Sequence, residues 1–134
     1  MIEYVLDTDT CIYWLKGKEE IRIKVNEIGA ECLSMTIVTL AELNYGAYNS
    51  GKVSANIANI HKFVKKVRVL PFESDAAERF GRIKTELRRS GQIIQDFDIL
   101  IASIVLSHGG VLVTNNVGHF KRITGLRYDN WLQE

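Results

Sequence analysis

The sequence predicts an α/β fold in which helices cover both faces of a central, mainly parallel sheet of four to five strands. Short apolar segments alternate with longer segments of helical character along the chain. This alternation is typical of parallel sheets whose strands are buried on both faces. The length of 134 residues fits one hydrophobic core. We therefore expect a single domain that spans residues 1–134 as an α/β/α sandwich.

Five short segments of the sequence read as strands. An apolar run of four or five residues bounded by turn residues is typical of a buried strand. The first predicted strand ends at Asp7, and the third is closed by Pro71, which has no N–H to continue a ladder. The predicted strands are residues 2–6, 32–36, 67–70 and 111–114, with a weaker fifth at residues 126–128.

Helical segments separate these strands. The clearest is residues 75–89, because acidic residues open it, Arg88 and Arg89 close it and Gly91 follows it. Residues 98–107 are apolar on nearly every side, and their number favours a buried central helix over a strand. The other predicted helices are residues 11–17, 20–28, 37–48 and 53–66.

Composition excludes several classes of protein. The longest apolar run, residues 99–106, is far shorter than the roughly 18–20 residues that span a bilayer. The N-terminus lacks the basic and hydrophobic segments of a secretory signal. Cys11 and Cys32 lack metal-binding spacing and are expected to be buried thiols. We therefore expect a cytoplasmic protein without membrane contact, and its net charge of +1 leaves any attraction to nucleic acid to local patches.

Polar residues gather where the predicted strands end. Asp7 ends the first strand, Glu42 lies early in the helix after the second, and Asn116 follows the fourth. Asp98, at the start of the buried helix, could reach the same edge, where ligands of parallel sheets collect. Crowded carboxylates repel unless a cation compensates them, and oxygen ligands without clustered His or Cys favour Mg²⁺ or Mn²⁺. The pattern indicates metal-assisted phosphodiester hydrolysis, since such an ion activates water and stabilises a leaving oxygen.

The same residues also have structural interpretations. Thr8 or Asp9 could simply cap the first helix, and for either residue alone this is the favoured interpretation. Asp7 points to function, because an ionisable residue directly after an apolar strand risks burial without a partner. Asp96 is expected either to be an N-cap or to support a ligand by hydrogen bonding. A capping role for Asp98 weighs about as much as a functional one.

Other candidates are weaker when taken singly. Glu42 alone would usually be a solvated helix residue, and Asn116 alone is typical of a turn or cap. Basic residues along 75–89 could hold phosphates, but pairing with nearby glutamates on a solvated surface is favoured. None of the three dispersed histidines is expected to be a catalytic base: His61, His108 and His119.

Four segments of the chain form a family pattern in order. They are YVLDTD at residues 4–9, TLAELNYG at residues 39–46, DFDILIA at residues 96–102 and VTNN at residues 113–116. Together they resemble the PIN-domain ribonucleases, and most closely the VapC toxins of prokaryotic toxin–antitoxin systems. The resemblance spans nearly the whole chain and implies a PIN-like sandwich.

The resemblance implies three metal-binding acidic residues: Asp7, Glu42 and Asp98. Asn116 completes the expected catalytic set, at a position where many relatives carry a fourth Asp. The number of Mg²⁺ or Mn²⁺ ions bound, one or two, therefore stays open. Thr8 and Thr114 would support the ligands by hydrogen bonding. Asp9 stands where the family often has Asn, which places an extra negative charge near the metal.

The resemblance also implies an activity and partners. Relatives cut RNA endonucleolytically, often a tRNA or a ribosomal RNA loop, and usually act as homodimers. A small VapB-type antitoxin silences them by inserting a segment into the active-site groove. The residues that contact RNA are not predicted. Four aromatic residues could serve a dimer or antitoxin contact, although packing within the monomer is the default interpretation: Tyr13, Trp14, Tyr45 and Tyr48.

Two other families share part of the pattern. Residues 6–10 resemble the opening of a haloacid-dehalogenase-type phosphatase, but Cys11 stands where that pattern has Thr or Val, and no positioned lysine precedes a late acidic motif. A receiver-like phospho-acceptor module would need an Asp ending the third strand, where the chain has Leu70 and Pro71. A non-catalytic PIN module that only binds a partner stays open from the sequence.

Overall fold

The centre of the molecule is a five-stranded, all-parallel sheet with the strand order β3-β2-β1-β4-β5. The structure is a computed structural model that describes residues 1–132. The strands are β1 (Tyr4–Leu6), β2 (Leu33–Thr36), β3 (Arg68–Leu70), β4 (Val111–Val113) and β5 (Tyr128–Asp129). The sheet confirms the predicted fold class.

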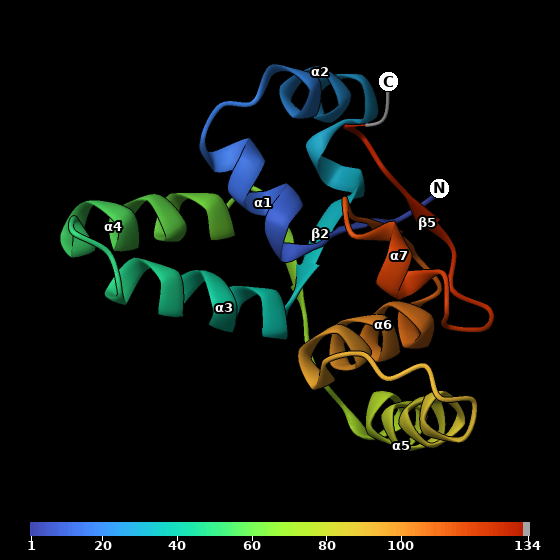
Figure 1. Cartoon of the computed structure of the whole chain (residues 1–134). Coiled ribbons are helices and arrows are strands. Elements are labelled where there is room, and N and C mark those ends of the chain that lie inside the picture. Colours follow the sequence, from blue (N-terminus) through green and yellow to red (C-terminus); the bar gives the residue numbers. More distant parts are fainter. Residues whose placement is uncertain (133–134) are drawn as a thin grey trace.

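Helices cover both faces of this sheet (Figure 1). One hydrophobic cluster joins α1 to α4 to the sheet, and a second joins α5 to α7 to its other face, so the expected sandwich is confirmed. No helix within residues 1–132 combines the length and apolar character that crossing a bilayer requires. The helices are α1 (Thr8–Leu15), α2 (Glu19–Ile28), α3 (Ile37–Tyr48), α4 (Val53–Val64), α5 (Ser74–Arg89), α6 (Asp96–His108) and α7 (Val117–Phe120), with a 3₁₀ turn at Ala30–Cys32.

The central strand β1 is apolar throughout because both of its sides face the core. Val5 and Leu6 are fully buried, and they belong to opposite hydrophobic clusters. Successive strand residues point to opposite faces, so a strand covered on both sides has no position for a charged residue. The next charged residue therefore comes directly after the strand, and it is Asp7.

A few predicted bounds and burials differ from the structure. The fifth strand begins at Tyr128, after a turn at Gly125 whose φ is 83°. Cys11 is buried as expected, but Cys32 lies in the 3₁₀ turn and is only half-buried. Helix α7 was not predicted, because four residues are too few to show a helical period.

The aromatic residues divide into two groups. The Trp14 ring packs edge-on against the Phe63 ring at 5.0 Å between centroids, and Tyr13 also packs against the core. Tyr45 and Tyr48 on α3 are 71% and 68% exposed. Packing within the monomer is therefore confirmed for Tyr13 and Trp14 and wrong for the two tyrosines of α3, which face solvent.

Candidate active site

Asp7 is held between the ends of two neighbouring strands. It follows β1, caps the N-terminus of α1 and is only 6% exposed. One carboxylate oxygen accepts the Thr8 N–H at 2.8 Å, and the other accepts the hydroxyl of Thr114, just past β4, at 2.7 Å. The suggested capping by Thr8 or Asp9 is wrong, because the residue that leaves the strand already occupies the cap.

The charge of Asp7 is poorly solvated and has acidic neighbours. Burial, and then the negative charges of Asp9 and Asp98, raise the pKa of Asp7 to about 7, although the hydrogen bonds from Thr114 and Thr8 favour its charged form. Burial also raises the pKa of Asp9. Three carboxylates therefore share one region at the carboxyl edge of the sheet, where like charges raise the cost of ionisation.

Glu42 reaches this region through Thr8. Helix α3 begins directly after β2, so its second turn lies beside α1. The Thr8 hydroxyl donates to Glu42 Oε1 at 2.5 Å and lies 3.1 Å from the Thr39 hydroxyl. Glu42 is half-buried. The hydrogen bonds expected of Thr8 and Thr114 are thus present, while the metal-binding role of the acidic residues stays a prediction.

Asp98 contacts His119, and His119 in turn contacts Asn116. It is half-buried in the first turn of α6, and its Oδ2 lies 3.1 Å from His119 Nδ1. The Asn116 side-chain nitrogen lies 2.8 Å from the same His119 nitrogen. The Asn116 backbone N–H donates to the Thr114 hydroxyl at 2.9 Å, so Thr114 contacts both Asp7 and Asn116.

Asp96 lies on another side of α6. The N-cap of α6 is Gln95, so the suggested capping role of Asp96 is wrong. Its exposed carboxylate pairs with Lys84 Nζ of α5 at 2.9 Å. Because two residues along a helix are separated by about 200° of rotation, Asp96 faces α5 while Asp98 faces α7. The other suggested role, support of a ligand by hydrogen bonding, finds no contact here.

His119 is the residue that sequence reasoning missed. Dispersed histidines gave no signal, yet the short helix α7 brings His119 against Asp98. The one available hint was its position three residues after Asn116, the spacing that places two side chains on the same side of a helical turn.

The ligand types at this site suit a hard divalent cation, but their side chains are not yet arranged around one. Asp7, Asp98 and Glu42 supply oxygen ligands, and a cation would compensate the charge that burial makes costly at Asp7. Within residues 1–132, however, no three His, Cys, Asp or Glu side chains are arranged to hold a metal ion. Glu42 contacts Thr8 and Asp98 contacts His119 instead, so metal binding would require these carboxylates to exchange partners.

An apolar groove lies beside Glu42. It has a volume of about 290 Å³ and runs between α1, α3 and α4. Apolar side chains from all three helices line it: Ile12, Leu15, Leu43, Ala47 and Ile60. The site is therefore flanked by a surface that suits an apolar segment of another chain.

Comparisons with known proteins place this arrangement in a family. The PIN domain family matches residues 4–126. A tRNA(fMet)-specific endonuclease VapC of Salmonella typhimurium is 38% identical over 132 residues, covering 98% of this chain and 99% of that protein. Ribonuclease VapC2 of Haemophilus influenzae is 40% identical over 134 residues, covering 98% of this chain and 100% of that protein.

A solved structure gives the same result in three dimensions. A chain of the DNA-bound VapBC structure from Salmonella typhimurium superposes with a TM-score of 0.92 at 38% identity, covering 98% of this chain and 99% of that chain. Neither the phosphatase nor the receiver-like alternative accounts for these matches. With its acidic edge, its all-parallel sheet and these relatives, the chain belongs to the PIN-domain family and, within that family, to the VapC ribonucleases.

Proposed function

We propose that the chain is a divalent-metal-dependent endoribonuclease and the toxin component of a type II toxin–antitoxin pair. The observation that carries the proposal is the buried Asp7, whose pKa burial and neighbouring carboxylates raise to about 7 at the carboxyl edge of the sheet. A neutral Asn would cap α1 as well as Asp7 does, whereas a metal-binding site requires a carboxylate at this position. Membership of the VapC ribonucleases supports the same activity.

Four residues carry the proposed chemistry. Asp7, Asp98 and Glu42 would hold Mg²⁺ or Mn²⁺, and Asn116 would add a neutral oxygen. When bound, such an ion lowers the pKa of a water molecule and stabilises charge on the phosphodiester. Asp7 and Asp98 concentrate negative charge at the point where the ion must sit, and the surrounding apolar core fixes their backbone.

Two threonines orient these ligands. Thr114 donates to Asp7 and accepts from the Asn116 backbone, so one hydroxyl sets the distance between two strand ends. Thr8 donates to Glu42 and thereby links α3 to α1. Hydrogen bonds of this kind restrict the rotamers of ligating carboxylates and tune their basicity. Their role is positioning, since neither threonine adds a charge.

The substrate is inferred to be a folded RNA, with tRNA as the first candidate. One similar protein is named as specific for tRNA(fMet). Purified tRNAs and ribosomal RNA, tested side by side, would separate the two substrate classes that the family resemblance implies.

A VapB-type antitoxin is the inferred protein partner. Similar solved structures are VapBC complexes, one from Salmonella typhimurium and one from Rickettsia felis. The apolar groove between α1, α3 and α4 suits a short amphipathic helix, and Glu42 at its edge places such a helix next to the site. We infer that the antitoxin silences the enzyme by occupying this groove.

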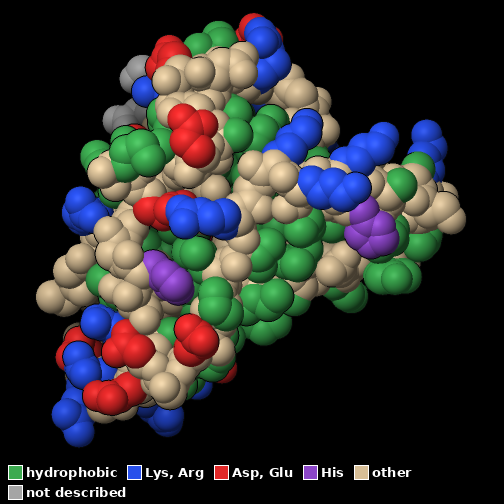
Figure 2. All heavy atoms as spheres, turned by 180° about the vertical axis from the view of Figure 1, so that it is seen from behind, with side chains coloured by type: hydrophobic (Ala, Val, Ile, Leu, Met, Phe, Trp, Pro, Cys, Tyr) green, Lys and Arg blue, Asp and Glu red, His purple; other side chains and the backbone are tan. Residues whose placement is uncertain are grey.

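A homodimer is also expected. Hydrophobic side chains gather on the face shown in Figure 2, in the angle between the α3–α4 pair and the α5–α6 pair. An apolar surface of this kind favours association with another chain. Sedimentation of the antitoxin-free protein should give the mass of two chains, and a monomer at micromolar concentration would contradict the dimer.

The test is cleavage of total RNA and purified tRNA by the antitoxin-free protein with Mg²⁺ or Mn²⁺. Discrete fragments should form, and they should disappear with EDTA and in Asp7→Asn and Asp98→Asn. Asp96→Asn is the matched control, because this carboxylate lies two residues from Asp98 but pairs with Lys84. Failure of folded wild-type protein to cut any RNA would favour a non-catalytic binding module. Equal loss in Asp96→Asn would undo the assignment of site residues.

A further inference from the structure

Three side chains meet at one nitrogen atom beside α7. His119 Nδ1 lies 3.1 Å from Asp98 Oδ2 and 2.8 Å from the Asn116 side-chain nitrogen. The His119 side chain is 41% exposed and that of Asp98 is 19% exposed. The imidazole therefore stands at the mouth of the acidic region, with a half-buried carboxylate on its inner side and solvent on its outer side.

One ring nitrogen cannot satisfy both neighbours by hydrogen bonding. The Asn116 amide nitrogen is a donor, so Nδ1 accepts from it in the tautomer that carries its proton on Nε2. Asp98 Oδ2 is also an acceptor and lies close to the same nitrogen. Two acceptors at this separation repel each other unless a proton or a metal ion lies between them.

We propose that His119 is a nitrogen ligand of the same metal ion as Asp98, an inference that rests on the metal site of the proposed function. The 3.1 Å between Nδ1 and Oδ2 suits adjacent corners of a coordination octahedron. Bonds of about 2.1–2.2 Å place such corners about 3.0–3.1 Å apart. Asp98 Oδ2 and His119 Nδ1 thus already lie at the separation of one edge of the site. The ion would replace their direct contact and the contact of Asn116 with Nδ1, and Glu42 would exchange its Thr8 partner for the ion.

A nitrogen ligand changes which ion the site selects. Mg²⁺ prefers carboxylate and water oxygens, whereas imidazole suits first-row transition ions. Within a site of mixed carboxylate and imidazole ligands, Mn²⁺ therefore gains over Mg²⁺. We therefore expect the site to bind Mn²⁺ about tenfold more tightly than Mg²⁺, with most of this preference due to His119.

The experiment measures metal binding by the whole metal-free, antitoxin-free chain. Isothermal titration calorimetry with Mn²⁺ and with Mg²⁺ compares wild type, His119→Ala and Asp98→Asn. His108→Ala is the matched control, because His108 is exposed at the opposite end of α6. His119→Ala should weaken Mn²⁺ binding about tenfold and change Mg²⁺ binding by less than about twofold. His108→Ala should change neither.

Pulsed electron paramagnetic resonance of the Mn²⁺-loaded protein identifies the ligand directly. A bound imidazole gives nitrogen-14 modulation, which should be present in wild type and His108→Ala and absent in His119→Ala. Circular dichroism checks that each variant is folded. If His119→Ala does not fold, His119→Gln replaces it, because the amide fills similar space and lacks a ring nitrogen.

The outcomes separate this inference from the proposed function. Wild-type affinity for Mn²⁺ in His119→Ala, or no nitrogen modulation in wild type, would overturn the inference and leave His119 as a hydrogen-bond partner of Asp98. Loss of Mn²⁺ binding in Asp98→Asn under the same conditions would preserve the proposed metal site. Unchanged Mn²⁺ binding in both variants would overturn the metal site itself and the inference with it.

Discussion

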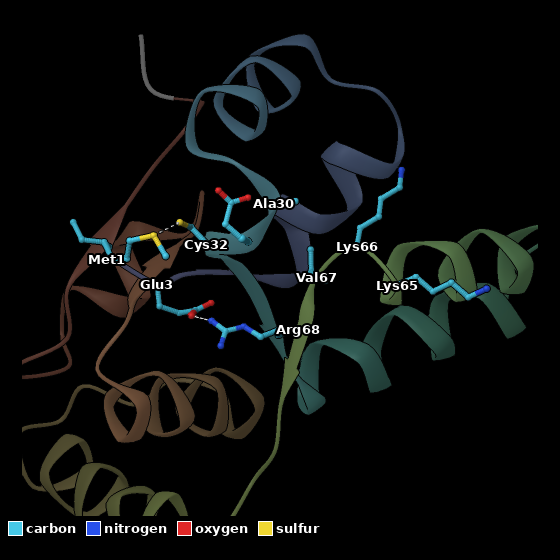
Figure 3. A pocket seen from close by; sticks show the side chains of 10 residues that line it. Met1, Glu3, Ala30, Cys32, Lys65, Lys66, Val67 and Arg68 are labelled. Carbon is cyan, nitrogen blue, oxygen red and sulfur yellow. Dashed lines mark hydrogen bonds and ion pairs between the residues drawn. The ribbon is translucent and has the colours of Figure 1, made fainter.

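Acidic residues have opposite surroundings at the two edges of the sheet, which are formed by the amino ends and the carboxyl ends of its strands. At the amino edge, Glu3 precedes β1 and forms an ion pair with Arg68, the first residue of β3, beside a hollow of about 470 Å³ (Figure 3). At the carboxyl edge, Asp7 follows the same strand and is buried. In the part of the chain that the structure describes, no lysine or arginine pairs with Asp7.

This difference distinguishes structural charge from functional charge. A buried carboxylate without a cationic partner costs folding free energy, so a protein keeps one where its activity needs it. The hollow at the amino edge is larger than the groove beside Glu42, yet the charge of Glu3 in its lining is already neutralised by Arg68. Charge balance, more than volume, therefore identifies the working edge of the sheet.

The sharpest test of the contrast is one substitution type at both edges. Asp98→Asn removes a proposed metal ligand, and we expect the rate of RNA cleavage to fall by about 10³-fold or more, as for loss of a main electrostatic group. Glu3→Gln should change the rate by less than about twofold. A quantitative cleavage assay at saturating Mn²⁺ measures both, and comparable losses at the two edges would remove the distinction.

Thr114→Val tests whether hydroxyl positioning matters at the carboxyl edge. Valine keeps the shape of the side chain but cannot donate to Asp7 or accept from the Asn116 backbone. Because groups that support ligands are worth about 10–100-fold in metal affinity or activity, cleavage should fall by that factor. Thr85→Val is the control, since the Thr85 hydroxyl donates to the Gly81 carbonyl of its own helix, α5. Wild-type activity in Thr114→Val would mean that Asp7 needs no such support.

The cost of the buried charge should be visible in folding stability without metal. Asp7 has a pKa of about 7 in the folded chain, against 3.8 ordinarily. The folded state therefore holds a proton that the unfolded state releases between these values, so stability falls as pH rises from about 4 to about 7. Asp7→Asn avoids this loss, and its free energy of unfolding at pH 8 should exceed that of wild type by about 1–3 kcal/mol.

Urea denaturation in EDTA at pH 4 and pH 8 measures this gain. The difference between Asp7→Asn and wild type should be small at pH 4, where folded Asp7 is protonated, and large at pH 8. Equal differences at both pH values would show that Asp7 pays no burial cost. Added Mn²⁺ should stabilise wild type, by about 2.7 kcal/mol at a free concentration of 100 times its dissociation constant, and leave Asp7→Asn nearly unchanged.

The contrast between the edges also shows what the sequence could predict. The fold followed from the alternation of apolar runs with helical segments, because burial on both faces leaves β1 no polar position before Asp7. The same logic brought Glu42 and Asn116 to the carboxyl edge. These inferences depend on the chain direction and on the parallel sheet, both of which the pattern specifies.

The directions in which side chains point were harder to predict from the sequence. Asp96 and Asp98 are two residues apart, and a shift of the helix start by one residue exchanges their surroundings, so the cap at Gln95 could not be distinguished from one at Asp96. His119 depends on a four-residue helix that has no sequence period. The ion pair between Glu3 and Arg68 joins segments far apart in the chain, and only the β1-β2-β3 order brings them together.

The smallest expected effect concerns that ion pair. Arg68 is well exposed, so Glu3→Gln should lower the free energy of unfolding by only about 0.5 kcal/mol at 0.1 M salt, and the difference should vanish near 1 M salt. Part of the loss is offset because no hydrogen-bond partner from residues 1–132 reaches the buried Glu3 Oε2. Urea denaturation at both salt concentrations measures the difference. A salt-independent loss above about 2 kcal/mol would mean that the amino edge also holds a desolvated charge. The two edges would then differ only in their effect on RNA cleavage and no longer in charge balance.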